Sequence, residues 1–363
     1  MQLSHSGHGV VSDQSGTASA ASAVPLLLIA TWCFTTMDPS TIVIVSSPAA
    51  ESGFIEWDGG KLRLLDSFYG IEVLGQGLRG AISFFAPSTL GFDSIGSWQF
   101  FQFLTDIGPL YSIWYLESSR PLNARSPAYL PTLFTFLGGI VGVGTVVPLY
   151  YFLCIAFGPS VSELDRSPRQ QSRSQYNTAA VPMIFLFHKS VVFAMFMSPD
   201  LAARHNWTWA WQMSPLFVGI GNAVASTAFG LGESTGSGSG SHKATPGLML
   251  SMMTLVSAGV WVYTFIFYPH SLSTLFVPQA GPQTGLILHM RKALQADEIG
   301  TFVGVFMPLA HSFSDRYISG LVGCEGLLYM ILGTVASLCV GPGAALALCW
   351  YLREGILENA TTA

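Results

Sequence analysis

The segment from Gly96 to Asn123, GSWQFFQFLTDIGPLYSIWYLESSRPLN, constrains the fold of this chain most strongly. It is apolar and aromatic enough to lie in a membrane, yet Asp106 stands at its middle. A carboxyl group at mid-bilayer costs roughly 2.5 kcal/mol or more on insertion scales, so it usually has a functional or pairing role. Pro109 has no N–H and its ring opposes the carbonyl of Thr105, which predicts a kink beside the acid. The segment indicates a polar site at lipid depth.

The rest of the chain has the composition of a membrane protein. Of its 363 residues 50% are hydrophobic and only 10% are charged, whereas a soluble protein carries about 25% charged residues. Apolar runs long enough to cross a bilayer recur along the chain. We expect spans near 24–47, 97–117, 129–154, 179–198, 208–230, 247–268 and 298–314, and in the run that ends near 350. The sequence predicts an all-α membrane protein, a polytopic helical bundle with about seven to eight transmembrane helices.

Composition also predicts how the chain is divided. Residues 1–23 are rich in Ser, Gly and Ala without periodicity, which is typical of a disordered tail. Residues 24–353 form one transmembrane helical domain, and its Gly/Ser-rich segment 231–246 is expected to be a flexible loop. Residues 354–363 form a C-terminal tail. The expected surroundings are the lipid bilayer, with the endoplasmic reticulum as the expected membrane.

Several function classes are excluded by what the sequence lacks. The net charge of −5 has no basic block, which argues against a nucleic acid partner. The five cysteines lie in or beside apolar segments without metal-ligand spacing. The motifs of nucleotide-binding, zinc-dependent and diphosphate-ionising enzymes do not occur. We therefore expect no metal and no organic cofactor, and the remaining chemistry is protonation or passive transport.

Asp106 has two interpretations. Desolvation at mid-depth favours its neutral form, and a neutral carboxylic acid in an apolar site is a good proton donor. Tyr111 and Trp114 lie near it in the sequence, where their ring faces could stabilise a carbocation. The alternative is an Asp that packs helices together through a hydrogen bond to a neighbouring span.

Glu117 shares a helix face with Asp106 but stands too far away to touch it. The two residues are eleven positions apart, which is roughly 16 Å along a straight helix. Glu117 and Arg120 stand at i and i+3, where they can pair, and Pro121 then ends the helix. The pair is either part of a site or an interfacial ion pair that holds the helix end.

A longer pattern surrounds this pair. It runs Glu117-Ser118-Ser119-Arg120-Pro121-Leu122-Asn123, then Pro131, then Gly142-Val143-Gly144, then Pro148-Leu149-Tyr150-Tyr151-Phe152-Leu153. Over about residues 96–159 the chain resembles the fungal integral-membrane terpene cyclases of ascofuranone and ascochlorin biosynthesis. Members of that family cyclise a farnesyl side chain, epoxidised at its terminus, on an aromatic polyketide.

The resemblance implies a membrane-bound, cofactor-independent terpene cyclase of the isomerase type in fungal meroterpenoid secondary metabolism. Its substrate would be an apolar prenylated small molecule, and Asp106 first or Glu117 second would protonate the epoxide. Arg120 and Asn123 would orient Glu117 or a polar head group. The residues expected to shield the cation from water are Tyr111, Trp114 and Tyr150.

Two functions of other classes stay open. One is a transporter or exporter of a metabolite, in which Asp106 acts as a protonation switch. The other is a non-catalytic membrane scaffold for neighbouring biosynthetic enzymes, which are also the expected protein partners of a cyclase. The chain has no internal repeat of the kind from which many transporters are built, and this favours the enzyme.

Overall fold

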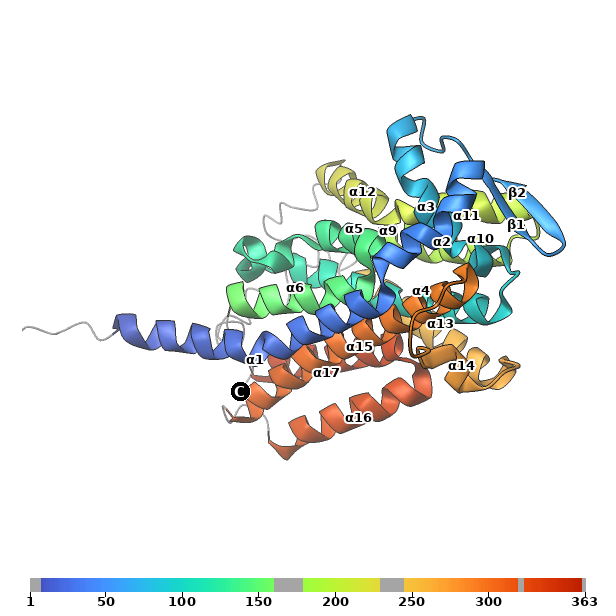
Figure 1. Cartoon of the computed structure of the whole chain (residues 1–363). Helices are drawn as coiled ribbons and strands as arrows, with labels where there is room; N and C mark the ends of the chain where they lie inside the picture. The colour runs from blue at the N-terminus through green and yellow to red at the C-terminus, as the bar shows by residue number, and fades with distance from the viewer. Residues whose placement is uncertain (1–7, 160–178, 229–244, 319–322, 361–363) are drawn as a thin grey trace, which may run out of the picture.

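The computed structural model describes residues 8–159, 179–228, 245–318 and 323–360, and these residues are mostly helical. Figure 1 shows α1, α6, α15, α16 and α17 side by side with their axes roughly aligned, with a small hairpin at one end of the molecule and the C-terminus at the other. The elements are α1 (His8–Met37), α2 (Pro39–Ser52), β1 (Phe54–Trp57), β2 (Gly60–Arg63), α3 (Glu72–Leu90), α4 (Ser94–Ser118), the 3₁₀ helices η1 (Pro121–Arg125) and η2 (Pro127–Tyr129), α5 (Pro131–Val141), α6 (Val143–Phe157), α9 (Ala180–Ile184), the π-helical turn η3 (Phe185–Lys189), α10 (Ser190–Met197), α11 (Leu201–Gln212), α12 (Ser214–Ala228), α13 (Thr245–Phe267), α14 (Leu272–Phe276), α15 (Leu286–Ile318), α16 (Cys324–Val340) and α17 (Pro342–Ala360).

Three segments of the described chain are long and apolar enough to cross a membrane: Ala21–Ser52, Ala180–Met197 and Gly247–Phe267. They correspond to three of the expected spans. The total of seven or eight spans stays a prediction, since α5, α6 and part of α16 are apolar but shorter.

Two of the expected spans are divided because the chain turns inside them. Gly142 has φ +102°, a conformation that side chains rarely adopt, and it separates α5 from α6 within the predicted span 129–154. Asp38 has φ +49° and separates α1 from α2. Its carboxylate accepts a hydrogen bond from the Thr41 amide, so it caps α2.

The expectation of an all-α protein needs one correction. β1 and β2 form an antiparallel hairpin in which Phe54 pairs with Arg63 and Trp57 with Gly60. The hairpin packs Ile55 against a small separate core that includes Leu64 and Trp209. Asp58-Gly59, a two-residue turn between alternating segments, was the sequence signal for this hairpin. Contacts between β1 and α2 stabilise it.

α4 is the central helix of the bundle. Nearly all its side chains are buried, including both polar and aromatic ones. It packs against α3, α13, α15 and α17, among others. Its first turn is held by Asp93, which accepts from the Gly96 amide and from Nε of Arg291 on α15, at 2.9 Å. The segment singled out in the sequence therefore forms the interior of the fold.

Described helices reach into both predicted tails, and the division into domains stays a prediction. α1 begins at His8, inside the segment 1–23 that composition predicts to be a disordered tail. α17 runs through Glu354 to Ala360, inside the predicted C-terminal tail. Of the predicted flexible loop 231–246, residues 231–244 lie outside the described residues.

Candidate functional site

Asp106 lies fully buried between helices. Gln102 donates a hydrogen bond to its Oδ2 at 2.7 Å, and Ser257 of α13 donates to its Oδ1. Gly343 of α17 rests on its backbone, where a Cβ atom would come within 2.4 Å of the Asp106 carbonyl oxygen. These are the contacts expected from the packing interpretation of Asp106. Its catalytic role stays a prediction.

The backbone next to Asp106 is bound by two side chains of a neighbouring π-helical turn. Pro109 removes the N–H that would bond the Thr105 carbonyl, and Nζ of Lys189 donates to that oxygen instead. His188 donates from Nε2 to the Leu104 carbonyl at 2.9 Å, because a carbonyl can only accept. π-helical turns are frequent at functional sites.

Two further polar residues lie beside Asp106. Lys189 is close enough to interact with it electrostatically, and so is Glu298 of α15, which lies next to Gln102. Glu298 and Lys189 are both buried. Glu298 has no predicted role, because it stands at the start of the span expected near 298–314, whereas α15 begins at Leu286. Asp297 and Glu298, adjacent acids inside an apolar helix, were the signal for it.

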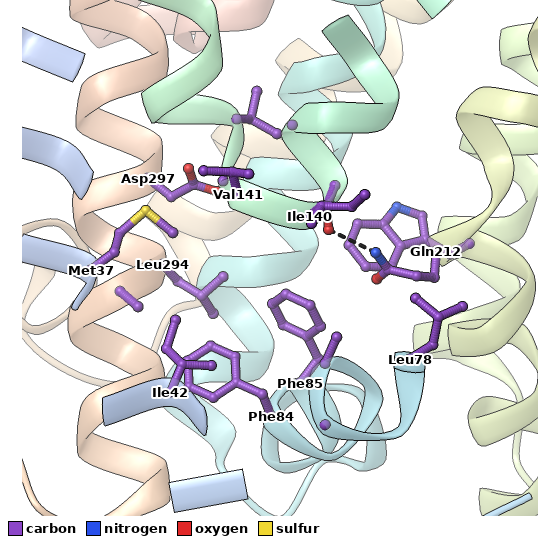
Figure 2. Close-up of a pocket in the computed structure, with 18 of the residues that line it drawn as sticks. Met37, Ile42, Leu78, Phe84, Phe85, Ile140, Val141, Gln212, Leu294 and Asp297 are labelled. Atoms are coloured by element: carbon purple, nitrogen blue, oxygen red, sulfur yellow. Dashed lines mark hydrogen bonds between the residues drawn. The ribbon is translucent and has the colours of Figure 1, made fainter. Parts of the chain in front are cut away.

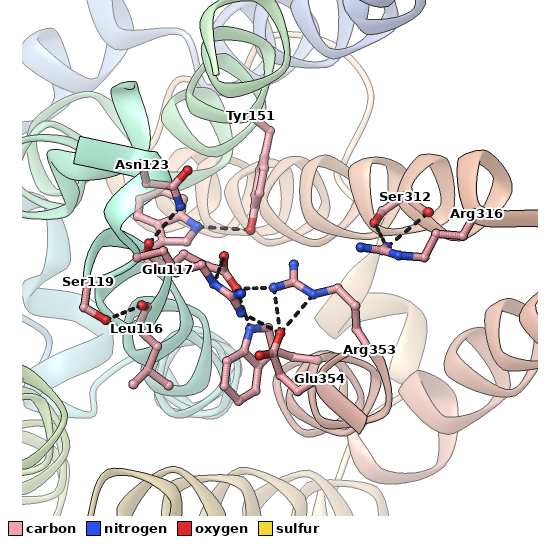
Figure 3. Close-up of polar contacts among 12 residues, drawn as sticks. Leu116, Glu117, Ser119, Asn123, Tyr151, Ser312, Arg316, Arg353 and Glu354 are labelled. Carbon is pink, nitrogen blue, oxygen red and sulfur yellow. Dashed lines mark hydrogen bonds and ion pairs between the residues drawn. The ribbon is translucent and has the colours of Figure 1, made fainter. Parts of the chain in front are cut away.

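Glu117 belongs to a separate ionic cluster at the other end of α4 (Figure 3). The predicted pairing with Arg120 is confirmed, with Nε 2.8 Å from Oε2. Arg353 also pairs with Glu117, and Glu354 pairs with both arginines, at 2.6 Å from Arg120 and 2.9 Å from Arg353. Trp350 donates from its indole nitrogen to Glu117 at 2.8 Å. Two cations and an indole N–H thus hold this carboxylate between α4 and α17.

Asn123 completes the end of α4. Its Nδ2 donates at 2.8 Å to the backbone carbonyl of Glu117, one of the acceptors that the helix end leaves without an intrahelical partner. Asn123 therefore contacts the backbone of Glu117, and Arg120 contacts its side chain. Substrate contacts for either residue stay predictions.

The predicted aromatic residues lie in one cluster between α4 and α6. The ring centroids of Trp114 and Tyr150 are 4.1 Å apart, and those of Tyr111 and Trp114 are 6.1 Å apart. Tyr111 also meets the ring of His188 edge-on at 5.7 Å. Of these predicted aromatics, Tyr111 lines the cavity described next.

A cavity of about 580 Å³ lies beside α4, on a different face from Asp106 and Glu117. Its walls come from α1, α2, α3, α4, α5, α6, η3, α11, α12 and α15, and they are largely apolar. Aromatic rings form much of the lining: Phe84, Phe85, Phe100, Phe103, Tyr111 and Trp211. Neither Asp106 nor Glu117 lines it, because those side chains project from α4 toward α13 and α17.

Polar groups stand at two sides of this cavity (Figure 2). Asp297 of α15 lies on one side, and Gln212 of α11 lies on the other, where it donates to the Gly139 carbonyl at 2.7 Å. His188 lines the cavity as well. Asp297 is the one carboxylic acid among the described residues that line the cavity. The arrangement can hold a long apolar molecule with a polar group near Asp297.

Comparisons with known proteins show which proteins this chain is similar to. The family model described as CtvD domain matches residues 49–281, more than half of the chain. The chain is 29% identical over 211 residues to the terpene cyclase ascI of Acremonium egyptiacum, which covers 55% of this chain and 52% of that protein. The resemblance to terpene cyclases of this type is therefore confirmed. No solved structure matches the chain.

Two other relatives are oxygenases. The chain is 29% identical over 315 residues to the FAD-dependent monooxygenase verC1 of Penicillium polonicum, covering 85% of this chain and 39% of that protein. It is 22% identical over 264 residues to the FAD-dependent monooxygenase BOA8 of Botryotinia fuckeliana, covering 69% of this chain and 33% of that protein. The chain thus spans about half or less of the length of these curated relatives, all of which are enzymes.

Proposed function

The chain belongs to the CtvD domain family, and from this membership we propose that it is a membrane-bound cyclase of fungal meroterpenoid secondary metabolism. Its substrate is an apolar prenylated aromatic polyketide with an epoxide at the end of a farnesyl chain. The enzyme protonates the epoxide and the chain closes into rings. The likeness to terpene cyclase ascI supports the reaction class.

The cavity is the single observation that carries this proposal. Its volume of about 580 Å³ lies within the range of roughly 300–1,000 Å³ that small-molecule sites occupy. Its aromatic walls suit a cationic intermediate, since ring faces attract positive charge and exclude the water that would quench it. The carboxyl group of Asp297 at one side meets the need for an acid.

The proposed reaction is an isomerisation. An O–H proton passes from a carboxylic acid to the epoxide oxygen, and the C–O bond breaks as a neighbouring alkene forms a new C–C bond. The last cation loses a proton to water, and the acid regains one from water. Substrate and product therefore have the same mass.

The epoxide requires a preceding oxidation. Two relatives of this chain are FAD-dependent monooxygenases in which it covers well under half of the length. We propose that an enzyme activity of that class supplies the epoxide, and that both act at the endoplasmic reticulum membrane, from which an apolar substrate enters.

The test uses detergent-solubilised protein with an epoxy-farnesyl phenol, analysed by chromatography and mass spectrometry. A cyclase yields a new isomer of unchanged mass without any membrane gradient. A transporter or a scaffold yields none, because neither alters covalent bonds. Heat-denatured protein in the same detergent is the control for spontaneous opening of the epoxide. Unchanged substrate across a panel of epoxidised prenyl phenols would contradict the proposal.

A further inference from the structure

The chemistry at the cavity needs a proton donor that substrate can touch. Asp106 keeps no accessible surface, and its two carboxyl oxygens are bound by Gln102 and Ser257. Asp297 keeps 8% of its surface, and it lines the cavity (Figure 2). The difference decides which of these two acids a bound molecule can reach, and Glu298, which is also buried, does not line the cavity.

Asp297 is held in one orientation by the start of α6. The Gly144 amide donates to its Oδ1 at 2.6 Å. The two helices touch here, since a Cβ atom on Gly144 would come within 2.2 Å of the Asp297 carbonyl oxygen. The Val143 amide also bonds this carboxyl group. The first turn of α6 therefore fixes the orientation of the acid at the cavity wall.

The surroundings of Asp297 place the reacting end of a substrate. Met37, Leu294 and Tyr111 line the cavity with it, and Tyr111 lies close enough for an electrostatic interaction between the two side chains. The aromatic rings of Phe84, Phe85 and Phe100 line the same cavity. A polar atom at the end of an apolar chain would therefore sit at Asp297, with the chain lying along the rings.

We propose that Asp297 is the catalytic acid of this site, giving its carboxyl proton to the substrate oxygen, and that Asp106 is a residue of the helix interface. This assignment rests on the proposed function for its reaction. The anchoring of Asp297 to Gly144 keeps the donor in place throughout the step. After transfer, the Asp297 carboxylate takes a proton from water.

The first experiment is a pair of variants in the isomerisation assay. Asp297→Asn keeps an oxygen that can accept from the Gly144 amide, so α6 stays capped, but it has no acidic proton. We expect turnover to fall by about 10²- to 10⁴-fold, the contribution of general acid catalysis. Asp106→Asn is expected to keep turnover within about tenfold of the parent, because its carboxyl group does not reach the cavity. An active Asp297→Asn enzyme would overturn the assignment.

The second experiment does not depend on turnover. The apolar reagent dicyclohexylcarbodiimide reacts with a protonated carboxylic acid. The acid proton passes to a carbodiimide nitrogen and the carboxylate oxygen adds to the carbodiimide carbon. An acyl shift from oxygen to nitrogen then leaves a stable N-acylurea, which peptide mass spectrometry locates. We expect the adduct on Asp297, its loss in Asp297→Asn, and protection by a farnesyl phenol without an epoxide. An adduct on Asp106 with none on Asp297 would refute the assignment. If the farnesyl phenol protects Asp297 from the reagent but the protein converts no epoxide, the result would support the binding site and refute the cyclase function.

Discussion

Nζ of Lys189 donates a hydrogen bond to the carbonyl of Thr105, the group that Pro109 leaves without its intrahelical donor. The lysine reaches it because Gly108 has no side chain; a Cβ atom there would lie 2.4 Å from Cε of Lys189. The proline, the glycine and the lysine therefore form one arrangement that joins α4 to the π-helical turn and brings a cation close to Asp106.

The first prediction concerns the space at Gly108. Gly108→Ala should displace Lys189 and destabilise the protein by about 1–3 kcal/mol, the cost of overpacking. Gly259→Ala is the matched control, since nothing lies within 4 Å of a Cβ atom at that helical position, and alanine favours a helix by about 1 kcal/mol over glycine. Thermal unfolding in detergent measures both. Equal melting temperatures for the two variants would contradict the packing.

The second prediction concerns the charge on Lys189. Lys189→Met removes the donor to Thr105 and the cation near Asp106, so we expect a loss of about 3–5 kcal/mol, as for one partner removed from a buried pair. Adding Asp106→Asn should recover part of that loss, because the uncompensated carboxylate is then absent. Unfolding of both single variants and the double variant measures the coupling. Strictly additive effects would show that the two side chains act independently.

The third prediction compares two ion pairs of different burial. Arg120→Gln removes one of the two cations that Glu117 and Glu354 share and leaves them with Arg353, inside the protein, where the Arg120 side chain is 5% exposed. The expected cost is about 3–5 kcal/mol. Arg63→Gln breaks a pair with Asp66 whose side chains are 72% and 66% exposed, and should cost about 0–1 kcal/mol. Denaturant titration of the two variants should show this order, and the reverse order would refute a structural role for the buried cluster.

The fourth prediction tests the cavity as the substrate site. Ile42 lines it, whereas Ile44, two residues along α2, is 69% exposed and does not. Ile42→Trp should fill part of the cavity and raise KM or abolish turnover. Ile44→Trp adds the same bulk outside and should leave kinetics unchanged. Full activity of a folded Ile42→Trp protein would place substrate elsewhere.

The fifth prediction concerns pH and the hairpin end of the molecule. Nε2 of His205 accepts from the Trp209 indole at 3.1 Å and from the Leu65 amide at 3.4 Å, so it must be unprotonated. Burial lowers the pKa of His205 from 6.5 to about 4. The unfolded chain therefore binds a proton first, and stability that is complete above about pH 6.5 should fall by about 3 kcal/mol as the pH approaches 4.

Melting temperatures of the parent and of His205→Gln between pH 7 and pH 4 measure this effect. The glutamine carbonyl can accept a hydrogen bond and does not titrate, so the variant should lose most of the pH dependence in this window. The same slope in both proteins would assign the pH dependence to other groups.

Local sequence patterns predicted the helical architecture of this protein and several contacts within its helices. The apolar periodicity predicted a helical bundle, and the segments 179–198 and 247–268 correspond to helices long enough to cross a membrane. Pro109 marked the Thr105 carbonyl as free, and the spacing of Glu117 and Arg120 predicted their ion pair. These features follow from residues within a few turns of one another, where helix geometry alone decides the outcome.

Tertiary structure decided which buried acid meets a cavity. Asp106 stands out in the sequence because it lies within an aromatic, apolar segment, but the packing of α13 and α17 against α4 covers its face. No local pattern predicts a role for Asp297. The packing of α15 against α6, about 150 residues away in sequence, brings it to the cavity wall. Burial and access depend on contacts between distant helices, and no periodicity within one helix specifies which neighbour will cover which face.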